Sequence, residues 1–126
     1  QNELGLEDAK ALVSNGIIAV AEGANMPCTP EAVEYFLEQK ILFGPAKAAN
    51  AGGVATSGLE MSQNNMRVNW PFEKVDKKLY EIMVDIYQRT CQAAQEYGYA
   101  RNLVRGSNIA GFNKVADSML AYGITY

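Results

Sequence analysis

The chain has 126 residues, of which 48% are hydrophobic and 20% charged, and it carries a formal net charge of -3 without any histidine. These values are typical of one ordinary globular domain. The basic residues are interspersed with acids and no apolar run is long enough to span a bilayer, which argues against nucleic-acid and membrane partners. The absence of imidazole excludes histidine-dependent triads and the commonest zinc sites.

The cysteines and the first residues indicate in which cellular compartment the protein is expected. Cys28 and Cys91 are too few and too far apart for a disulfide framework or a metal motif. Because free cysteines usually serve as small buried hydrophobes, we expect two structural thiols in a reducing, cytoplasmic compartment. The first residues do not form a basic segment followed by an apolar one, and the chain does not begin with an initiator Met. This predicts no signal peptide and fits a piece of a longer polypeptide.

The N-terminal third alternates helical and extended patterns. Residues 6–15 predict a short helix, and the unbroken apolar run 17–21 is typical of a strand buried on both faces of a parallel sheet. Thr29 and Pro30 predict the N-cap and first turn of the next helix, and residues 41–43 predict a second strand. We therefore expect a right-handed βαβ unit, with further strands upstream because two strands do not make a covered sheet.

The remainder is predicted to be helical. One helix begins near Gly53, residues 72–97 form a long amphipathic helix of about 25 residues, and a last helix ends before Gly123. The predicted fold class is α/β, a partial Rossmann-like cofactor domain in which a βαβ unit of a parallel sheet is followed by long C-terminal helices. Residues 1–65 are the α/β part with the substrate loop, and residues 72–126 are the helical part.

The stretch after the second predicted strand, residues 47–65, carries the strongest signal for a site. Gly52 and Gly53 let the backbone approach a ligand, and the helix that follows offers free N–H groups in its first turn. Val54 and Ser57 are three residues apart and therefore share one face of that turn. This combination suits a small molecule that bears a carboxylate. The alternatives are a flexible glycine pair and a serine that bonds back to the carbonyl one turn earlier.

Two asparagines follow the two predicted strands. Asn25 comes after the first strand and Asn50 after the second, so both are expected at the carboxyl edge, where open α/β sheets bind ligands. Asn25 is predicted to bond to the ribose or nicotinamide of a dinucleotide, and Asn50 to a carboxamide or a bound amino acid. The alternative for Asn25 is an asparagine that caps the backbone of its own turn.

Three blocks of sequence resemble one enzyme family. They are Ala21-Glu-Gly-Ala-Asn25-Met-Pro27, Asn50-Ala-Gly-Gly-Val-x-x-Ser57-Gly-x-Glu60-Met-x-Gln-Asn64, and Asn102-Leu-Val-x-Gly106-x-Asn108-Ile-x-Gly-Phe112-x-Lys114-Val-Ala-Asp117. In this order they are similar to the strand end facing the nicotinamide, the substrate loop and helix, and the C-terminal helix of hexameric, microbial-type glutamate dehydrogenases. The resemblance implies that residues 1–126 are one C-terminal fragment of such an enzyme's dinucleotide-binding domain.

The resemblance also implies residue roles. Asn25 and Asn50 steady the nicotinamide side of NAD or NADP, Val54 packs on the carbon chain of the substrate, and Ser57 holds its distal carboxylate. Related dehydrogenases for leucine, valine and phenylalanine carry an apolar residue in place of this serine, so L-glutamate and 2-oxoglutarate are the expected substrates. The residues that select NAD or NADP lie outside the chain.

Other parts of the family's machinery have no counterpart in this sequence. No segment matches the motifs of the family's catalytic lysine and aspartate, nor its glycine-rich phosphate loop. We therefore expect no catalytic residue and no metal site here, and an inactive fragment when it is alone. The active form is expected to be a cytoplasmic homohexamer in which the N-terminal domain of the same polypeptide completes each subunit.

A second hypothesis is a non-catalytic binding or assembly module derived from the dehydrogenase domain. The missing phosphate loop favours it, whereas Ser57 argues against it because a scaffold does not need that hydroxyl. Lys47 stands beside the loop but is expected to be solvated and not catalytic. Glu22 and Glu60 are interpreted as structural hydrogen-bond acceptors.

Overall fold

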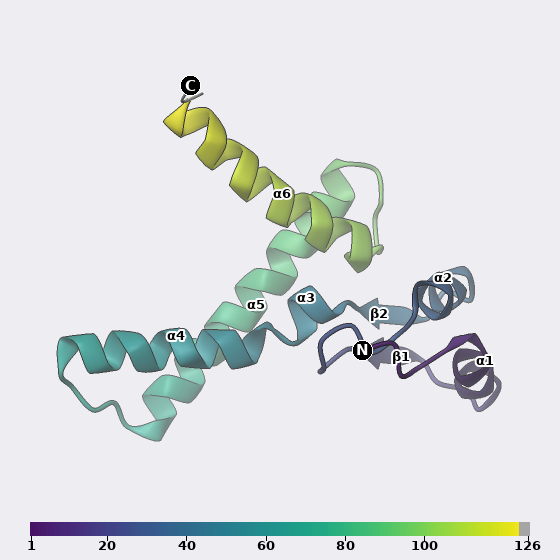
Figure 1. The fold of residues 1–126 in the computed structure, drawn as a ribbon, viewed down its shortest axis with the longest axis horizontal. Helices are drawn as coiled ribbons and strands as arrows, with labels where there is room; N and C mark the ends of the chain where they lie inside the picture. The colour runs from purple at the N-terminus through teal and green to yellow at the C-terminus, as the bar shows by residue number, and fades with distance from the viewer. Residues whose placement is uncertain (124–126) are drawn as a thin grey trace.

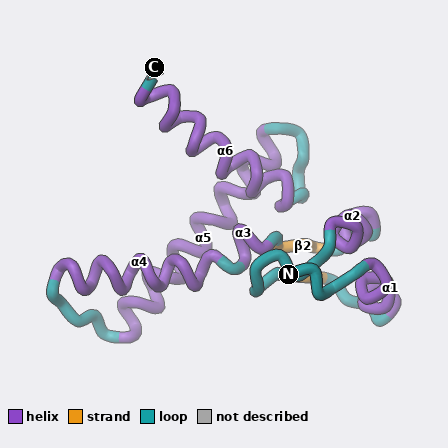
Figure 2. The backbone as a smooth tube through the Cα atoms, viewed as in Figure 1, coloured by secondary structure: helices purple, strands orange, loops and turns teal. Residues whose placement is uncertain are grey.

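A computed structural model gives the fold and describes residues 1–123 (Figure 1). The predicted helical part runs to residue 126, and its last three residues lie outside the described ones. In chain order the elements are α1 (Leu6–Ser14), β1 (Ala19–Ala21), α2 (Pro30–Glu38), β2 (Leu42–Gly44), α3 (Ala46–Ala49), α4 (Ala51–Met66), α5 (Phe72–Glu96) and α6 (Leu103–Tyr122). Figure 2 shows how short the two strands are beside the helices.

The predicted parallel βαβ unit is confirmed. Strands β1 and β2 pair in parallel, with Val20 opposite Phe43, and α2 connects them. Helix α2 begins as predicted, because the Thr29 side chain accepts a hydrogen bond from the Ala32 N–H at 3.4 Å. Strand β1 starts later than predicted because the Ile17 N–H still bonds to a carbonyl at the end of α1.

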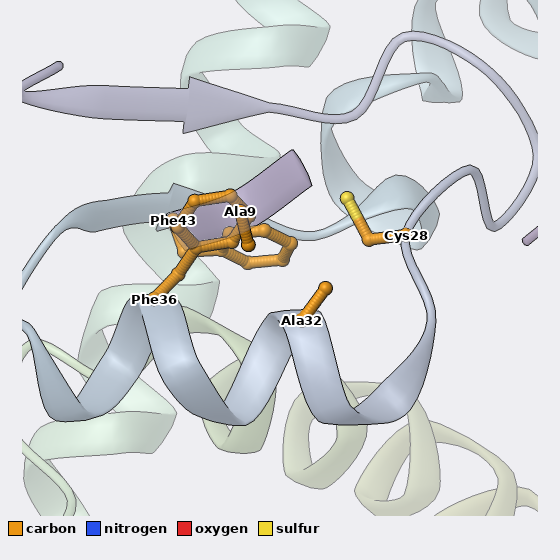
Figure 3. Close-up of a cluster of buried hydrophobic side chains, with 5 residues drawn as sticks. All are labelled: Ala9, Cys28, Ala32, Phe36 and Phe43. Carbon is orange, nitrogen blue, oxygen red and sulfur yellow. The ribbon is translucent and has the colours of Figure 1, made fainter. Parts of the chain in front are cut away.

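A small apolar core forms where α1 and α2 meet the sheet. Its buried members are Ala9, Cys28, Ala32, Phe36 and Phe43 (Figure 3). The Phe36 and Phe43 rings stack with their centroids 5.9 Å apart. This contact joins the last turn of α2 to the middle of β2, and so holds the connecting helix against the sheet.

The prediction that the first strand is buried on both faces is wrong for this structure. Ile18 is 80% exposed and Leu42 is 59% exposed, and only the central residue of β2 is buried. The physical reason is that the sheet has only two strands among the described residues, and the helices that contact it, α2 and the start of α6, leave Ile18 and Leu42 exposed.

The helical part is organised around α5, whose predicted length of 25 residues is confirmed. Helix α6 crosses the C-terminal end of α5. Helix α4 packs against the N-terminal half of α5 (Figure 1). At the α5–α6 crossing Gly106 is buried, and a Cβ there would overlap the carbonyl oxygen of Thr90 and lie 2.9 Å from the Cβ of Ala94. The two helices therefore meet at backbone distance.

The molecule is open for its size. Its accessible surface is 9266 Å², whereas a compact protein of this mass would expose about 6,600 Å². The excess includes large apolar side chains on the outer surface of α6, namely Phe112, Val115, Met119, Leu120 and Tyr122. Among residues 1–123, no helix combines the length and apolar character needed to cross a bilayer.

Candidate site at the carboxyl edge of the strands

A cleft of about 630 Å³ opens where β1 and β2 end. Its floor is apolar, with Val33 and Leu37 of α2 and Phe43 of β2. Its polar lining comes from the N-terminal segment, the segment after β1, α2, α3 with its C-cap, and the start of α6: Asn2, Glu22, Asn25, Glu34, Lys47, Asn50, Asn102 and Arg105. An apolar floor with a few polar groups on the rim is the usual composition of a small-molecule or cofactor site.

The two predicted asparagines lie together at this cleft. Asn25 stands on the loop after β1, and Asn50 joins the end of α3 to the start of α4. The Asn50 Nδ2 donates a hydrogen bond of 3.0 Å to the carbonyl oxygen of Ala24, the neighbour of Asn25. The Asn50 amide thus joins the two loops, while the side chain of Asn25 is exposed.

Glu22 is the structural acceptor that we expected. Its carboxylate is buried, with the residue 6% exposed. Oε1 accepts the backbone N–H of Cys28 at 3.2 Å, and Oε2 accepts that of Ala46, the first residue of α3, at 2.7 Å. The same prediction is not supported for Glu60, which is exposed on α4 with no hydrogen bond to its carboxylate among the described residues.

The thiol of Cys28 lies beside this carboxylate. Burial, together with the hydrogen bond and the negative charge of Glu22, raises the pKa of Cys28 to about 12. Cys28 therefore stays a protonated thiol at neutral pH, as expected for a structural cysteine. Cys91, on α5, is partly buried and is also a free thiol.

Helix α6 contributes to the cleft in a way that the sequence did not reveal. The Lys47 ammonium group on α3 donates a hydrogen bond to Oδ1 of Asn108 on α6. Lys47 is exposed, in agreement with the prediction of a solvated lysine. Asn108 belongs to the third sequence block, but nothing in its spacing indicates a partner 61 residues away. The contact ties the rim of the cleft to the helical part.

Val54 and Ser57 lie outside this cleft, on α4. Because α4 begins at Ala51 rather than near Gly53, Ser57 lies in the second turn, beyond the free N–H groups of the first. Its hydroxyl donates to the carbonyl oxygen of Gly53 at 3.3 Å, which is the alternative considered for a serine within a helix. Val54 is 79% exposed. The two side chains share one side of α4, as predicted, and both are exposed.

The glycine pair also differs from expectation. Gly52 and Gly53 are helical residues of α4 and not a loop that precedes the helix. A Cβ on Gly52 would lie 3.7 Å from the sulfur of Met83, so this glycine faces α5. A Cβ on Gly53 would meet nothing within 4 Å, so this position leaves open space beside the first turn.

Together these features define a class of protein. A parallel βαβ unit with a cleft at the carboxyl ends of its strands is typical of α/β proteins that bind nucleotides or other small molecules there. The cleft has both apolar side chains and the amide of Asn25 in its lining. Among residues 1–123, no three His, Cys, Asp or Glu side chains gather to hold a metal ion.

Comparison with known proteins identifies the family within this class. Residues 1–123 match the model of the glutamate/leucine/phenylalanine/valine dehydrogenases, so the chain belongs to that family. It is 58% identical over 127 aligned residues to the NADP-specific glutamate dehydrogenase of Salmonella typhimurium and 57% identical over 124 to that of Escherichia coli K12. Each alignment covers 98% of this chain but 28% of the relative. The chain thus spans little more than a quarter of the length of these relatives.

Solved structures agree with this assignment. Plasmodium falciparum glutamate dehydrogenase superposes with a TM-score of 0.95 and 49% identity, over 99% of this chain and 27% of that one. A subunit of the hetero-hexameric glutamate dehydrogenase of Thermus thermophilus gives a TM-score of 0.89 at 23% identity, over 100% and 29%. The likeness to the second protein concerns the fold alone. The predicted α/β fold class is confirmed.

Proposed function

We propose that this chain is the C-terminal part of the dinucleotide-binding domain of an NAD(P)-dependent glutamate dehydrogenase. The full-length enzyme interconverts L-glutamate and water with 2-oxoglutarate and ammonium. The observation that carries the proposal is the high identity to bacterial glutamate dehydrogenases over almost the whole chain, including the three motif blocks. Relatives are named NADP-specific or NAD(P)-specific, so the choice of cofactor stays open.

In this proposal the chain supplies one wall of the reaction cleft. The nicotinamide cofactor, when bound, takes up or supplies the hydride. Asn25 hydrogen-bonds to the nicotinamide side, and Asn50 keeps the neighbouring loop in place through its contact with Ala24. Val54 and Ser57 project from α4, where exposure leaves them available to a substrate held between this wall and the N-terminal domain.

Ser57 is the proposed specificity residue. Its hydroxyl now donates to a backbone carbonyl at 3.3 Å, a long contact that it can exchange for the distal carboxylate of the substrate. A hydrogen bond to a charged group contributes about 1.5–3 kcal/mol. This is enough to favour a dicarboxylate over an amino acid with an apolar side chain, for which the hydroxyl has no partner.

The proposal extends to a homohexamer of full-length subunits, each completed by its N-terminal domain. The open surface of this chain and its exposed apolar side chains support a larger assembled body. The cytoplasmic location is likewise a proposal and follows from the resemblance.

The first test uses the full-length protein, meaning the natural polypeptide that contains this chain. Oxidation of NADH and NADPH is followed separately in the presence of 2-oxoglutarate and ammonium. We expect rapid oxidation of at least one of the two. If neither is consumed, the dehydrogenase proposal is wrong and the binding or assembly module takes its place.

The same assay tests Ser57. In Ser57→Ala we expect the KM for 2-oxoglutarate to rise about 10- to 100-fold, the range for a lost hydrogen bond to a carboxylate. Ser62→Ala is the matched control, because Ser62 lies on the same helix and bonds back to Gly58 in the same way. An unchanged KM in Ser57→Ala, or an equal rise in both variants, would contradict the assigned role.

A further inference from the structure

The buried carboxylate of Glu22 connects two segments that carry proposed cofactor contacts. One oxygen binds the N–H of Cys28, which closes the loop that carries Asn25. The other binds the N–H of Ala46, at the start of the short helix that ends at Asn50. We call these two hydrogen bonds the Glu22 bridge. No basic side chain pairs with this carboxylate among the described residues, so backbone N–H groups are its partners.

The loop needs an external constraint to keep its shape. Met26, next to Asn25, has a φ of 51° in the left-handed region, which is unfavourable for a residue with a long side chain. The N-terminal segment holds the far side of the loop, because Asn2 donates to the Met26 carbonyl at 2.9 Å. Among the described residues, no backbone hydrogen bond joins that segment to α3. The backbone N–H of Glu22 also bonds to the Gly44 carbonyl at 2.9 Å, which joins the ends of the two strands. Beyond the strands, the Glu22 bridge and the Asn50–Ala24 bond connect the loop to the segment that carries the second asparagine.

We propose that Glu22 is a positioning residue for dinucleotide binding, which holds the Asn25 loop and the Asn50 segment at a fixed separation through the Glu22 bridge. This rests on the proposed dehydrogenase function. Glu22 does not touch the cofactor itself. Its geometry sets where the two amides stand before the cofactor arrives, so its loss weakens cofactor binding and leaves the chemical step intact.

Two substitutions in the full-length protein separate geometry from charge. Glu22→Gln keeps the length of the side chain but turns an NH₂ group toward one of the two N–H donors. Glu22→Asp keeps the charge but retracts the carboxylate by one methylene. We expect both to raise the KM for the dinucleotide about twofold to tenfold, the effect of loosening one hydrogen bond. The kcat and the KM for 2-oxoglutarate should change less than about twofold.

The matched control is Glu38→Gln, which removes a charge from an exposed position at the end of α2, away from the cleft. It should behave as wild type. The proposal is overturned if both Glu22 variants keep the wild-type KM for the dinucleotide. It is also overturned if kcat falls with both KM values unchanged, or if Glu22→Asp matches wild type while Glu22→Gln is impaired, because charge would then be the property that matters.

A second measurement does not depend on activity. As the first residue of α3, Ala46 has no acceptor for its N–H within the helix, so its protection from hydrogen exchange depends on Glu22. In the cofactor-free wild type we expect slow exchange at Cys28 and Ala46, and faster exchange in both variants, read by mass spectrometry on peptides spanning 24–29 and 45–50. Rapid exchange at Ala46 in the wild type overturns the bridge even if no variant folds.

The two proposals can fail separately. A wild-type protein that consumes neither NADH nor NADPH overturns the dehydrogenase function and, with it, the role of Glu22 in cofactor binding. An active wild-type protein whose Glu22 variants bind the dinucleotide normally overturns the Glu22 proposal alone.

Discussion

At the scale of single residues, the cleft is shaped by a carboxylate and a thiol that share one buried corner. Glu22 satisfies two backbone donors that would otherwise be buried without acceptors. The Cys28 thiol beside it cannot ionise easily, because burial and the neighbouring negative charge both oppose a thiolate. The folded protein therefore holds the Cys28 proton more tightly than the unfolded chain does.

This difference predicts how stability depends on pH. The pKa of Cys28 is raised from 9.0 to about 12, so between these values the folded state binds more protons than the unfolded state. The Cys28 contribution to the free energy of unfolding is then complete below pH 9 and is lost as the pH rises toward 12. We expect urea unfolding of the full-length protein to show this loss in wild type and in Cys91→Ala, but a shallower decline in Cys28→Ala. Equal slopes in all three proteins would contradict the assignment.

At the scale of elements, the α5–α6 crossing joins the rim of the cleft to the helical part. Gly106 allows the two backbones to meet, and Lys47 on α3 bonds to Asn108 two residues further along α6. The start of α6 also contributes Asn102 and Arg105 to the rim of the cleft. The position of α6 against α5 thus determines one side of the candidate site.

Gly106→Ala tests this crossing. The new methyl group would overlap the Thr90 carbonyl, so the helices must move apart, and overpacking of this kind costs about 1–3 kcal/mol. Gly111→Ala on the same helix meets nothing within 4 Å and should gain up to about 1 kcal/mol from helix propensity. The measurement is urea unfolding of the full-length protein by circular dichroism. A Gly106→Ala protein as stable as Gly111→Ala would show that the crossing is not tight.

At the scale of the whole molecule, the surface exceeds that of a compact protein of equal mass. The excess of about 2,700 Å² is the difference between 9266 Å² and the roughly 6,600 Å² expected. Exposed apolar side chains on α6 contribute to this excess. Ile18 and Leu42, at the starts of the two strands, are also largely exposed. Apolar surface that is exposed to water in this way favours association with other protein surfaces, including those of a second copy of the chain.

We therefore predict that the isolated 126-residue chain self-associates. Analytical ultracentrifugation should give masses that increase with concentration above the 13.7 kDa of one chain. A double substitution of Phe112 and Met119 by Ser should reduce the association, because both side chains are exposed on α6. A folded monomer at all concentrations would instead favour the stand-alone binding or assembly module.

Much of the fold was predictable, because local signals and tertiary contacts agree. The Thr29–Pro30 helix start, the parallel strand pair and the 25-residue helix follow from capping, apolar runs and periodicity. Predictions failed where local patterns leave the answer to packing. The glycine pair lies within α4, with Gly52 facing α5, and the first strand is shorter than predicted because the Ile17 N–H bonds to a carbonyl of α1.

The candidate site divides in the same way. The positions of Asn25 and Asn50 beside one cleft were predictable, because the carboxyl ends of parallel strands lie at one edge of a sheet, whereas their cofactor contacts stay predictions. The Lys47–Asn108 contact was not, because it joins residues far apart in the chain through the packing of α6. The roles of Val54 and Ser57 stay predictions, since both lie on open surface.

The sequence by itself determined the family, the βαβ unit and the residue types at the carboxyl edge, because these depend on local motifs and their order. Only the tertiary structure decided that Glu22 bridges two segments, that Gly106 lies in a helix crossing and that Lys47 bonds to Asn108. The physical reason is that hydrogen bonds and close contacts between distant segments depend on distances in space, which no local pattern encodes.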